Sequence, residues 1–121
     1  MSTPSSVTER YDAIVALWKS GRQDEAVAQM LELNAAEPSA ALPCAALAAW
    51  YKKLDRLDDA IKYAAQYCEL APDDSFGYSI LSSYYISVGL HTEAEEALMK
   101  ARDLRIAAQL EARRTADENP S

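Results

Sequence analysis

The apolar residues of this chain recur with the spacing of α-helices along most of its length. One clear example is a set of residues at positions i, i+3, i+4 and i+7, which are Cys44, Leu47, Ala48 and Tyr51. Side chains at this spacing lie on one face of a helix and can pack together against a neighbour. No stretch combines polar–apolar alternation with strand-forming residues, and glycine is rare, so the pattern predicts an all-α fold.

Cap and breaker residues divide this pattern into six helices. Ser6 with Glu9 and Thr92 with Glu95 have the spacing of capping boxes. Glycine or proline follows several of the apolar segments and favours a helix end there. Further N-caps are predicted at Ser39, Asp58 and Asp74 or Ser75. The expected helices cover about residues 7–20, 24–36, 40–54, 58–71, 75–89 and 92–115.

The chain repeats itself with a period of 34 residues. The positions related by this shift include Gly21, Asp55 and Gly89, then Ala26, Ala60 and Ala94, and finally Pro38 and Pro72. Small residues at the alanine position let two helix backbones approach closely. Ile106 takes the place of the proline in the third copy, so the last helix is expected to continue.

The repeat resembles the tetratricopeptide repeat (TPR), a helix–turn–helix unit with the pattern W-x2-L-G-x2-Y…A-x3-F…P. The middle copy carries the resemblance best, through Cys44, Leu47, Ala48, Tyr51, Ala60, Ala64 and Pro72. The resemblance implies a right-handed α-solenoid of three repeats with an extended C-terminal helix. We expect one TPR domain over 7–116, with repeats at about 7–40, 41–74 and 75–108, and disordered ends at 1–6 and 117–121.

Charge and hydropathy exclude several classes of function. The formal net charge is −7, so the chain lacks the cationic surface that nucleic-acid binding needs. No apolar run approaches the roughly 20 residues that cross a bilayer, and the first residues lack the order of a signal peptide. A cytoplasmic protein without membrane insertion is therefore predicted. Cys44 and Cys68 have no C-x-x-C spacing and are expected to be reduced core residues.

Enzyme signatures are absent from the sequence. His91 lies beside Gly89 in a predicted turn, and no catalytic constellation of a nucleophile or carboxylates can be placed around it. The acids of the first helical turns, where the helix dipole favours them, are Asp58, Asp59, Glu93, Glu95 and Glu96. There is no glycine-rich phosphate loop and no Cys/His cluster, so we expect no catalysis, no cofactor and no metal.

The resemblance implies a concave groove that is lined by the first helix of each repeat and holds a peptide or helix. The candidate groove residues are Tyr11, Val15, Trp18, Lys19, Leu42, Ala45, Ala49, Lys52, Phe76, Ser79, Ser83 and Ile86. Such an apolar channel suits an amphipathic helix or an extended apolar segment. Val15, Ala45 and Ala49 could instead pack within the superhelix, whereas Trp18 and Phe76, taken as large exposed aromatics, favour an interface.

Some TPR domains clamp the carboxylate terminus of Hsp90-type chaperones with Lys, Asn and Arg. The equivalent places here hold Tyr11, Val15, Ala46, Phe76 and Ile80, none of which grips a carboxylate through charge-assisted bonds. The predicted function is therefore another kind of non-enzymatic adaptor or chaperone, which binds a segment of a protein partner. Stand-alone three-repeat proteins of this size resemble, in outline, the type III secretion chaperones of bacteria.

Two further features leave alternatives open. Basic residues gather at the turns inside the first two repeats, namely Lys19, Arg22, Lys52, Lys53 and Arg56. They either complement helix dipoles or form a rim that orients an acidic or amphipathic partner. The last helix either supplies a polar end cap, folds back toward the groove, or offers Leu104, Ala108 and Leu110 for self-association. The alternative function is thus a self-assembling scaffold, a homo-oligomer.

Overall fold

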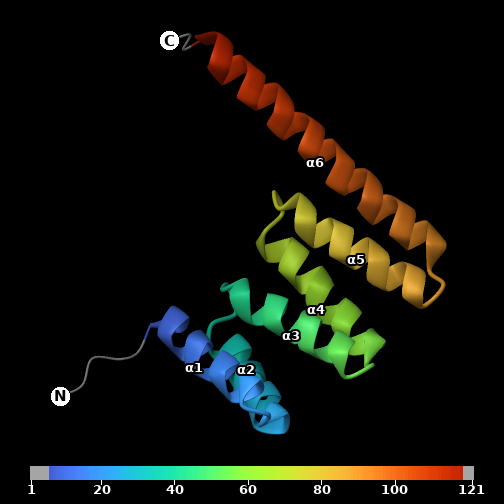
Figure 1. Cartoon of the computed structure of the whole chain (residues 1–121). Helices are drawn as coiled ribbons and strands as arrows, with labels where there is room; N and C mark the ends of the chain where they lie inside the picture. The colour runs from blue at the N-terminus through green and yellow to red at the C-terminus, as the bar shows by residue number, and fades with distance from the viewer. Residues whose placement is uncertain (1–5, 119–121) are drawn as a thin grey trace. The chain divides into compact units, whose positions relative to one another are not determined.

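The computed structural model describes residues 6–118, and within them all regular structure is helical. The six helices are α1 (Val7–Lys19), α2 (Gln23–Ala36), α3 (Leu42–Lys53), α4 (Leu57–Leu70), α5 (Ser75–Ser87) and α6 (His91–Glu118) (Figure 1). The predicted all-α class is confirmed. No helix in the described part of the chain is both long and apolar enough to span a membrane.

The helices form two compact units, which are divided between Leu70 and Ala71. In the first unit, α1 packs on α2, α2 on α3, and α3 on α4. In the second unit, α5 packs on α6. The single domain over 7–116 stays a prediction, and the disorder expected at 1–5 and 119–121 lies outside the described residues. Helix α6 continues to Glu118, beyond the expected domain end.

The turn between α3 and α4 serves both helices. The N–H of Arg56 donates to the carbonyl of Tyr51 at 2.8 Å, and the N–H of Asp55 donates to that of Lys52 at 3.1 Å. Asp55 has a φ of 60°, so the two bonds form a Schellman motif around a left-handed residue. The carbonyl of Arg56 then accepts the N–H of Ala60 at 3.0 Å. The residue that closes one helix therefore opens the next.

The same turn recurs after α1 and α5. Gly21 and Gly89 have φ values of 93° and 80°, where glycine carries no steric penalty. The N–H of Arg22 donates to the carbonyl of Leu17 at 3.0 Å, and the matching bond of the third copy closes at 2.9 Å. Three identical turns confirm the 34-residue period at the level of single hydrogen bonds.

Three predicted N-caps are wrong. Helices α4 and α6 begin at Leu57 and His91, so Asp58 and Thr92 lie inside the first turn. The Schellman turn leaves no room for a separate cap residue before these helices. Helix α3 has its N-cap at Ala41 instead of Ser39. A start at Ser39 would place Pro43 at the fourth helical position, where an N–H is needed and proline has none.

Two other predicted N-caps are confirmed. The Ser6 hydroxyl accepts the N–H of Glu9 at 3.0 Å, which begins α1. The Asp74 carboxylate accepts the N–H of Phe76 at 3.0 Å, which begins α5. Each bond satisfies a backbone donor that the first turn of a helix leaves without a partner.

The core of each unit is built where small residues let two helices approach. Ala60 of α4 is fully buried. The rings of Tyr51 on α3 and Tyr63 on α4 are stacked, with their centroids 5.7 Å apart. The predicted packing stripe of α3 is buried throughout, at Cys44, Leu47, Ala48 and Tyr51. In the second unit the buried Ser82 hydroxyl donates to the Ala94 carbonyl at 2.8 Å, which ties α5 to α6.

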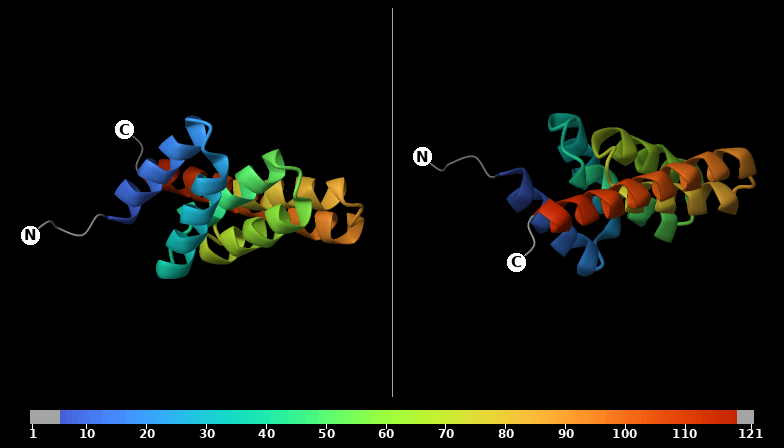
Figure 2. Two further views of the ribbon diagram at one scale, coloured as in Figure 1. Left: turned by 90° about the horizontal axis from the view of Figure 1, so that it is seen from below. Right: turned by 90° about the horizontal axis from the view of Figure 1, so that it is seen from above.

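Helix α6 is longer than the helix it packs against. It has 28 residues, whereas α5 has 13. Figures 1 and 2 show α6 beside α5 and then continuing past it. Ala101 is the last buried residue of α6, so the segment after Leu104 is held mainly by its own helical hydrogen bonds. The predicted extension, which follows from Ile106 in place of proline, is confirmed.

Candidate binding surfaces on the first helices

On α1 the candidate residues are less open than expected. Tyr11, Val15 and Trp18 are half-buried, and Lys19 is exposed. The Trp18 ring stacks on Trp50 of α3, with centroids 4.6 Å apart and the planes 2° from parallel. Trp18 is therefore not the exposed anchor that the sequence indicated, because the stack covers one face of its indole.

Trp50 is the residue that sequence reasoning missed. It is 6% exposed and links α3 to α1 within the first unit. It lies outside the predicted packing stripe of α3 and outside the candidate groove positions. The available signal was that the chain has two tryptophans, both on first helices of adjacent repeats, since large flat rings on neighbouring helices commonly stack.

On α3 the candidate residues form a shallow, small-residue surface. Ala49 and Lys52 are exposed, Ala45 is half-buried, and Leu42 is 45% exposed. Nothing bulky covers Ala49, so a partner side chain could approach the α3 backbone there. Ala49 is thus available at the surface, while Ala46 and Ala48 of the same helix are buried.

On α5 the apolar candidates are exposed and the polar ones are engaged. Phe76 is 69% exposed and Ile86 54%. The Ser79 hydroxyl accepts a hydrogen bond from Arg105 of α6 at 3.4 Å, and the Ser83 hydroxyl donates to the Ile80 carbonyl at 2.8 Å. The second unit therefore exposes Phe76 and Ile86 to a partner. The hydroxyls of Ser79 and Ser83 already take part in hydrogen bonds within this unit.

The basic rim predicted at the turns is partly neutralised. Arg22 pairs with Glu25 at 2.6 Å, and Arg56 pairs with Asp59 at 2.7 Å. These are the same positions of two repeats, and the exposed pairs are worth little in stability. The Arg56 guanidinium also lies 5.0 Å from the centroid of the Tyr51 ring. The two arginines therefore serve the turns themselves, which favours the local interpretation of the rim.

The two cysteines are buried and are not joined by a disulfide, as expected for core residues. The Cys44 sulfur lies 3.3 Å from Asn34 Oδ1 and 3.6 Å from Gln66 Oε1, so its thiol can donate to either amide oxygen. Burial raises the pKa of the Cys44 thiol, which keeps it protonated and a poor nucleophile. Burial, with a smaller contribution from Asp12, likewise raises the pKa of Tyr11.

Nothing in the described part of the chain indicates catalysis. No group of three or more His, Cys, Asp or Glu residues there could hold a metal ion. His91 is exposed at the first residue of α6. The surfaces of the first helices can bind through shape, apolar contact and a few lysines.

Comparison with known proteins identifies the repeat. A family model described as a tetratricopeptide repeat matches residues 43–74, which contain nearly all of α3 and the whole of α4. A search of curated protein sequences gave no match.

Solved structures share the fold at low sequence identity. The type III secretion translocator chaperone SycD of Yersinia enterocolitica is 17% identical with a TM-score of 0.72, over 97% of this chain and 98% of that one. The second TPR of Spaghetti (RPAP3), bound to an HSP90 peptide, is 21% identical with a TM-score of 0.70, over 81% and 91%. The protein MamA MSR-1 is 20% identical with a TM-score of 0.72, and the match covers 85% of this chain and 59% of that one. These likenesses confirm the fold class predicted from the repeat.

Proposed function

We infer that this chain, whose residues 43–74 are a tetratricopeptide repeat and whose fold is that of TPR proteins, is a non-enzymatic module that binds a segment of a partner protein. The segment is a helix or an extended strand of apolar character. The first helices of the repeats receive it within each unit, through the candidate residues of α1 and α3 in the first unit and those of α5 in the second.

One observation carries this proposal: the first helices present large apolar side chains to solvent. Phe76, Ile86 and Leu42 are 69%, 54% and 45% exposed, although each helix has a separate buried face. Exposed apolar groups of this size favour contact with a partner over contact with water. Ala45 and Ala49 add a surface low enough for a partner backbone to approach.

The chemistry of the proposed ligand differs from that of one structural neighbour. The Spaghetti domain was solved with the HSP90 peptide SRMEEVD, which is acidic. The five clamp-equivalent positions of this chain carry no cation, so an apolar segment suits them better than a carboxylate terminus. The likeness to a secretion translocator chaperone supports a role in shielding such a segment.

The test is capture of partners by the intact chain and by a groove variant. Ala49→Arg places a long charged side chain on the exposed α3 surface without disturbing the core. Ala28→Arg is the matched control, because Ala28 is also exposed but lies on α2. Proteins retained by the parent and the control and lost by Ala49→Arg support the groove. Equal retention by all three would place the binding site elsewhere.

The alternative function is a self-assembling scaffold. It is favoured by one observation, the exposure of Leu98, Met99, Ile106 and Leu110 on α6. Light scattering over a range of concentrations tests it. Oligomers that disappear when the chain is truncated after Ala101 would support the scaffold, and a monodisperse monomer would argue against it.

A further inference from the structure

The outer face of α6 is apolar and uncovered. The face that packs on α5 carries small residues, Ala94, Ala97 and Ala101, all of them buried. Other sides of the helix expose large ones, namely Leu98 at 50%, Met99 at 54%, Ile106 at 47% and Leu110 at 59%. A polar end cap, which was one prediction for this helix, would not need four such side chains in water.

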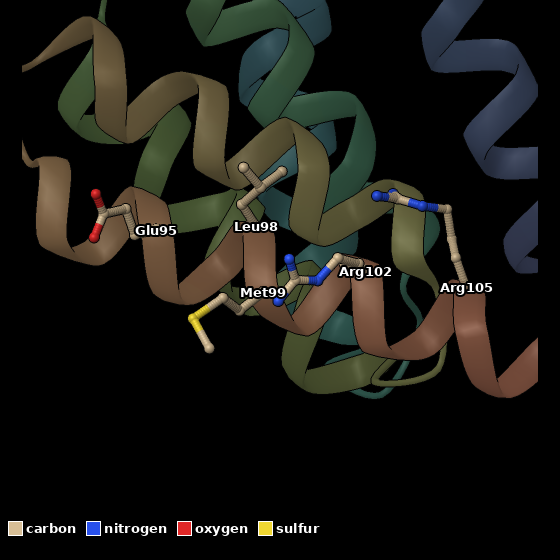
Figure 3. Close-up of a pocket in the computed structure, with 5 residues that line it drawn as sticks. All are labelled: Glu95, Leu98, Met99, Arg102 and Arg105. Carbon is tan, nitrogen blue, oxygen red and sulfur yellow. The ribbon is translucent and has the colours of Figure 1, made fainter.

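Two shallow hollows lie on this face, and both have the geometry of a coiled-coil hole. The first is lined by Glu95, Leu98, Met99, Arg102 and Arg105 (Figure 3). The second is lined by Ile106, Gln109, Leu110, Ala112 and Arg113. In each hollow, four of the five residues occupy positions i, i+3, i+4 and i+7, which is the spacing of the four-sided hole that a helix offers to one knob of a neighbouring helix.

The spacing of the two holes suits a second helix. Their first residues, Glu95 and Ile106, are eleven residues apart, which is about three helical turns or roughly 16 Å along the axis. The holes therefore open on the same side of α6. A heptad helix carries apolar knobs at steps of three and four residues, so two of its knobs that stand eleven residues apart would meet both holes.

The charge around the holes is positive, although the chain as a whole carries a net charge of −7. Arg102 and Arg105 border the first hole and Arg113 the second, against one acid, Glu95. Among the described residues these three arginines form no ion pair. Arg105 donates a hydrogen bond to the Ser79 hydroxyl at 3.4 Å.

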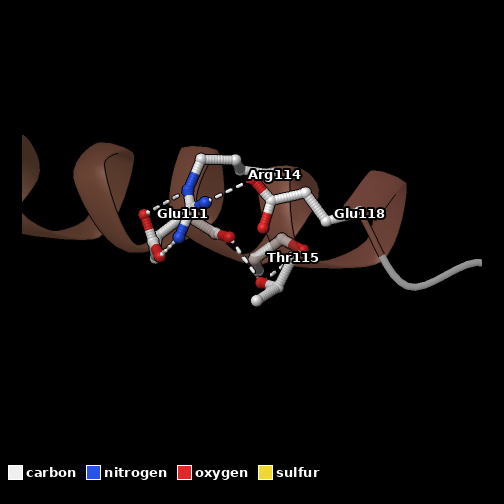
Figure 4. Close-up of polar contacts among 5 residues, drawn as sticks. Glu111, Arg114, Thr115 and Glu118 are labelled. Atoms are coloured by element: carbon white, nitrogen blue, oxygen red, sulfur yellow. Dashed lines mark hydrogen bonds and ion pairs between the residues drawn. The ribbon is translucent and has the colours of Figure 1, made fainter.

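Arg114 of the same helix provides the contrast. It lies outside both holes and pairs with Glu111 and, at 2.6 Å, with Glu118 (Figure 4). The charge of Arg114 is therefore paired with two glutamates of the same helix. Arg102, Arg105 and Arg113 form no such ion pair among the described residues. Their guanidinium groups therefore remain able to bind carboxylates in the bidentate manner that suits them.

We propose that the outer face of α6 is a second docking surface, which binds an acidic amphipathic helix of a partner protein. The apolar side chains of that helix enter the two holes, and its flanking carboxylates lie beside Arg102, Arg105 and Arg113. A second copy of this chain fits less well, because a symmetric pairing would bring the same arginines from both copies into one interface.

The probe is a synthetic helix of three heptads with leucine at the a and d positions and glutamate at the flanking positions. A matched peptide carries lysine in place of glutamate. Fluorescence anisotropy of each labelled peptide against the full chain measures binding. We expect the glutamate peptide to bind at least about tenfold more tightly than the lysine peptide, and its affinity to fall as salt is raised.

Charge reversal then locates the site. The double variant Arg102→Glu, Arg113→Glu should bind the glutamate peptide about tenfold more weakly than the parent and should bind the lysine peptide more tightly. The matched control Lys100→Glu, Arg114→Glu makes the same change of charge on α6, outside both holes, and should keep the preference of the parent. All four positions are exposed, and far-UV circular dichroism verifies that both variants fold.

Three results would overturn the proposal. The two peptides could bind alike or not at all. The control variant could lose as much affinity as the hole variant, which would make the effect one of overall charge. The peptide-free chain could form a dimer that the hole variant abolishes in light scattering, which would make a second copy the occupant.

Discussion

The α3–α4 and α5–α6 hairpins begin from the same turn and end very differently. Helix α4 buries four of its 14 residues, whereas α6 buries three of its 28, so much of α6 depends on its own helical hydrogen bonds and not on core contacts. Helix α4 ends at Leu70, just before Pro72. With Ile106 at the corresponding place, α6 runs on and leaves its apolar side chains exposed.

The comparison separates two kinds of information in one repeat. The turn residues decide where each hairpin folds back, and the turn has the same backbone hydrogen bonds in all three copies. The proline and the large core residues decide how much of the second helix is covered. The third copy has the same turn as the others but lacks the proline that ends the second helix. Four substitutions test this view.

The largest effect is expected from Ala60→Glu. Ala60 is fully buried in the unit where α4 packs on α3, and a carboxylate introduced there would be buried without a partner. We expect a loss of about 3–5 kcal/mol in the free energy of unfolding, enough to unfold the first unit. Ala28→Glu, on the exposed side of α2, is the control. A thermal melt equal to that of the parent would contradict the proposed packing.

Ile106→Pro restores the residue that stops the second helix in the other two copies. Proline in a helix interior costs about 3 kcal/mol locally. We expect the helical signal of residues 106–118 to be lost at 222 nm while the melting of the remainder changes little, because that segment is exposed. Ile106→Ala should keep the full signal. A variant as helical as the parent would show that the missing proline does not set the length of α6.

A smaller effect is expected from Ser82→Ala. The Ser82 hydroxyl is buried and donates to the Ala94 carbonyl, whereas the equivalent residue of the second copy is Ala48, which packs without a polar group. Loss of this hydrogen bond should lower the free energy of unfolding by about 1 kcal/mol. Denaturant titration measures it, with Ser83→Ala, whose hydroxyl is exposed, as the control expected to change little.

The smallest effect is a gain in stability from Asp55→Gly. Asp55 holds a φ of 60°, which costs an L-residue energy that glycine does not incur. The variant should be more stable by about 0.5–1 kcal/mol. Gly89→Asp should be less stable by a similar amount, because space for a side chain is open there and only the backbone is strained. Asp55→Asn tests the contribution of the charge. If Asp55→Gly and Gly89→Asp changed the stability in the same direction, backbone strain at this turn position would be excluded as the cause.

The sequence predicted the repeat well because its signals are local. Gly21, Asp55 and Gly89 define the turns, and the alanines at the closest helix approach define the packing stripes. The N-caps at Ser39, Asp58 and Thr92 were wrong because the Schellman turn and Pro43 override side-chain preference. Those competing effects depend on backbone hydrogen bonds that a pattern of residue types does not contain.

The binding surfaces were harder to predict, since they depend on what covers each side chain. The sequence predicts Trp18 to be an exposed anchor, whereas in the structure Trp50 is stacked on it. The holes of α6 need the relative placement of arginine and leucine on one face, together with the fact that nothing in the described chain covers them.

The stacked tryptophans also give the protein a built-in optical signal. Trp18 and Trp50 are the two tryptophans of the chain, and both belong to the first unit. Indole fluorescence during denaturation therefore follows that unit alone, while ellipticity at 222 nm follows the helices of both. Coincident curves would mean that the two units unfold as one cooperative species, and separated curves would give each unit its own midpoint without any label.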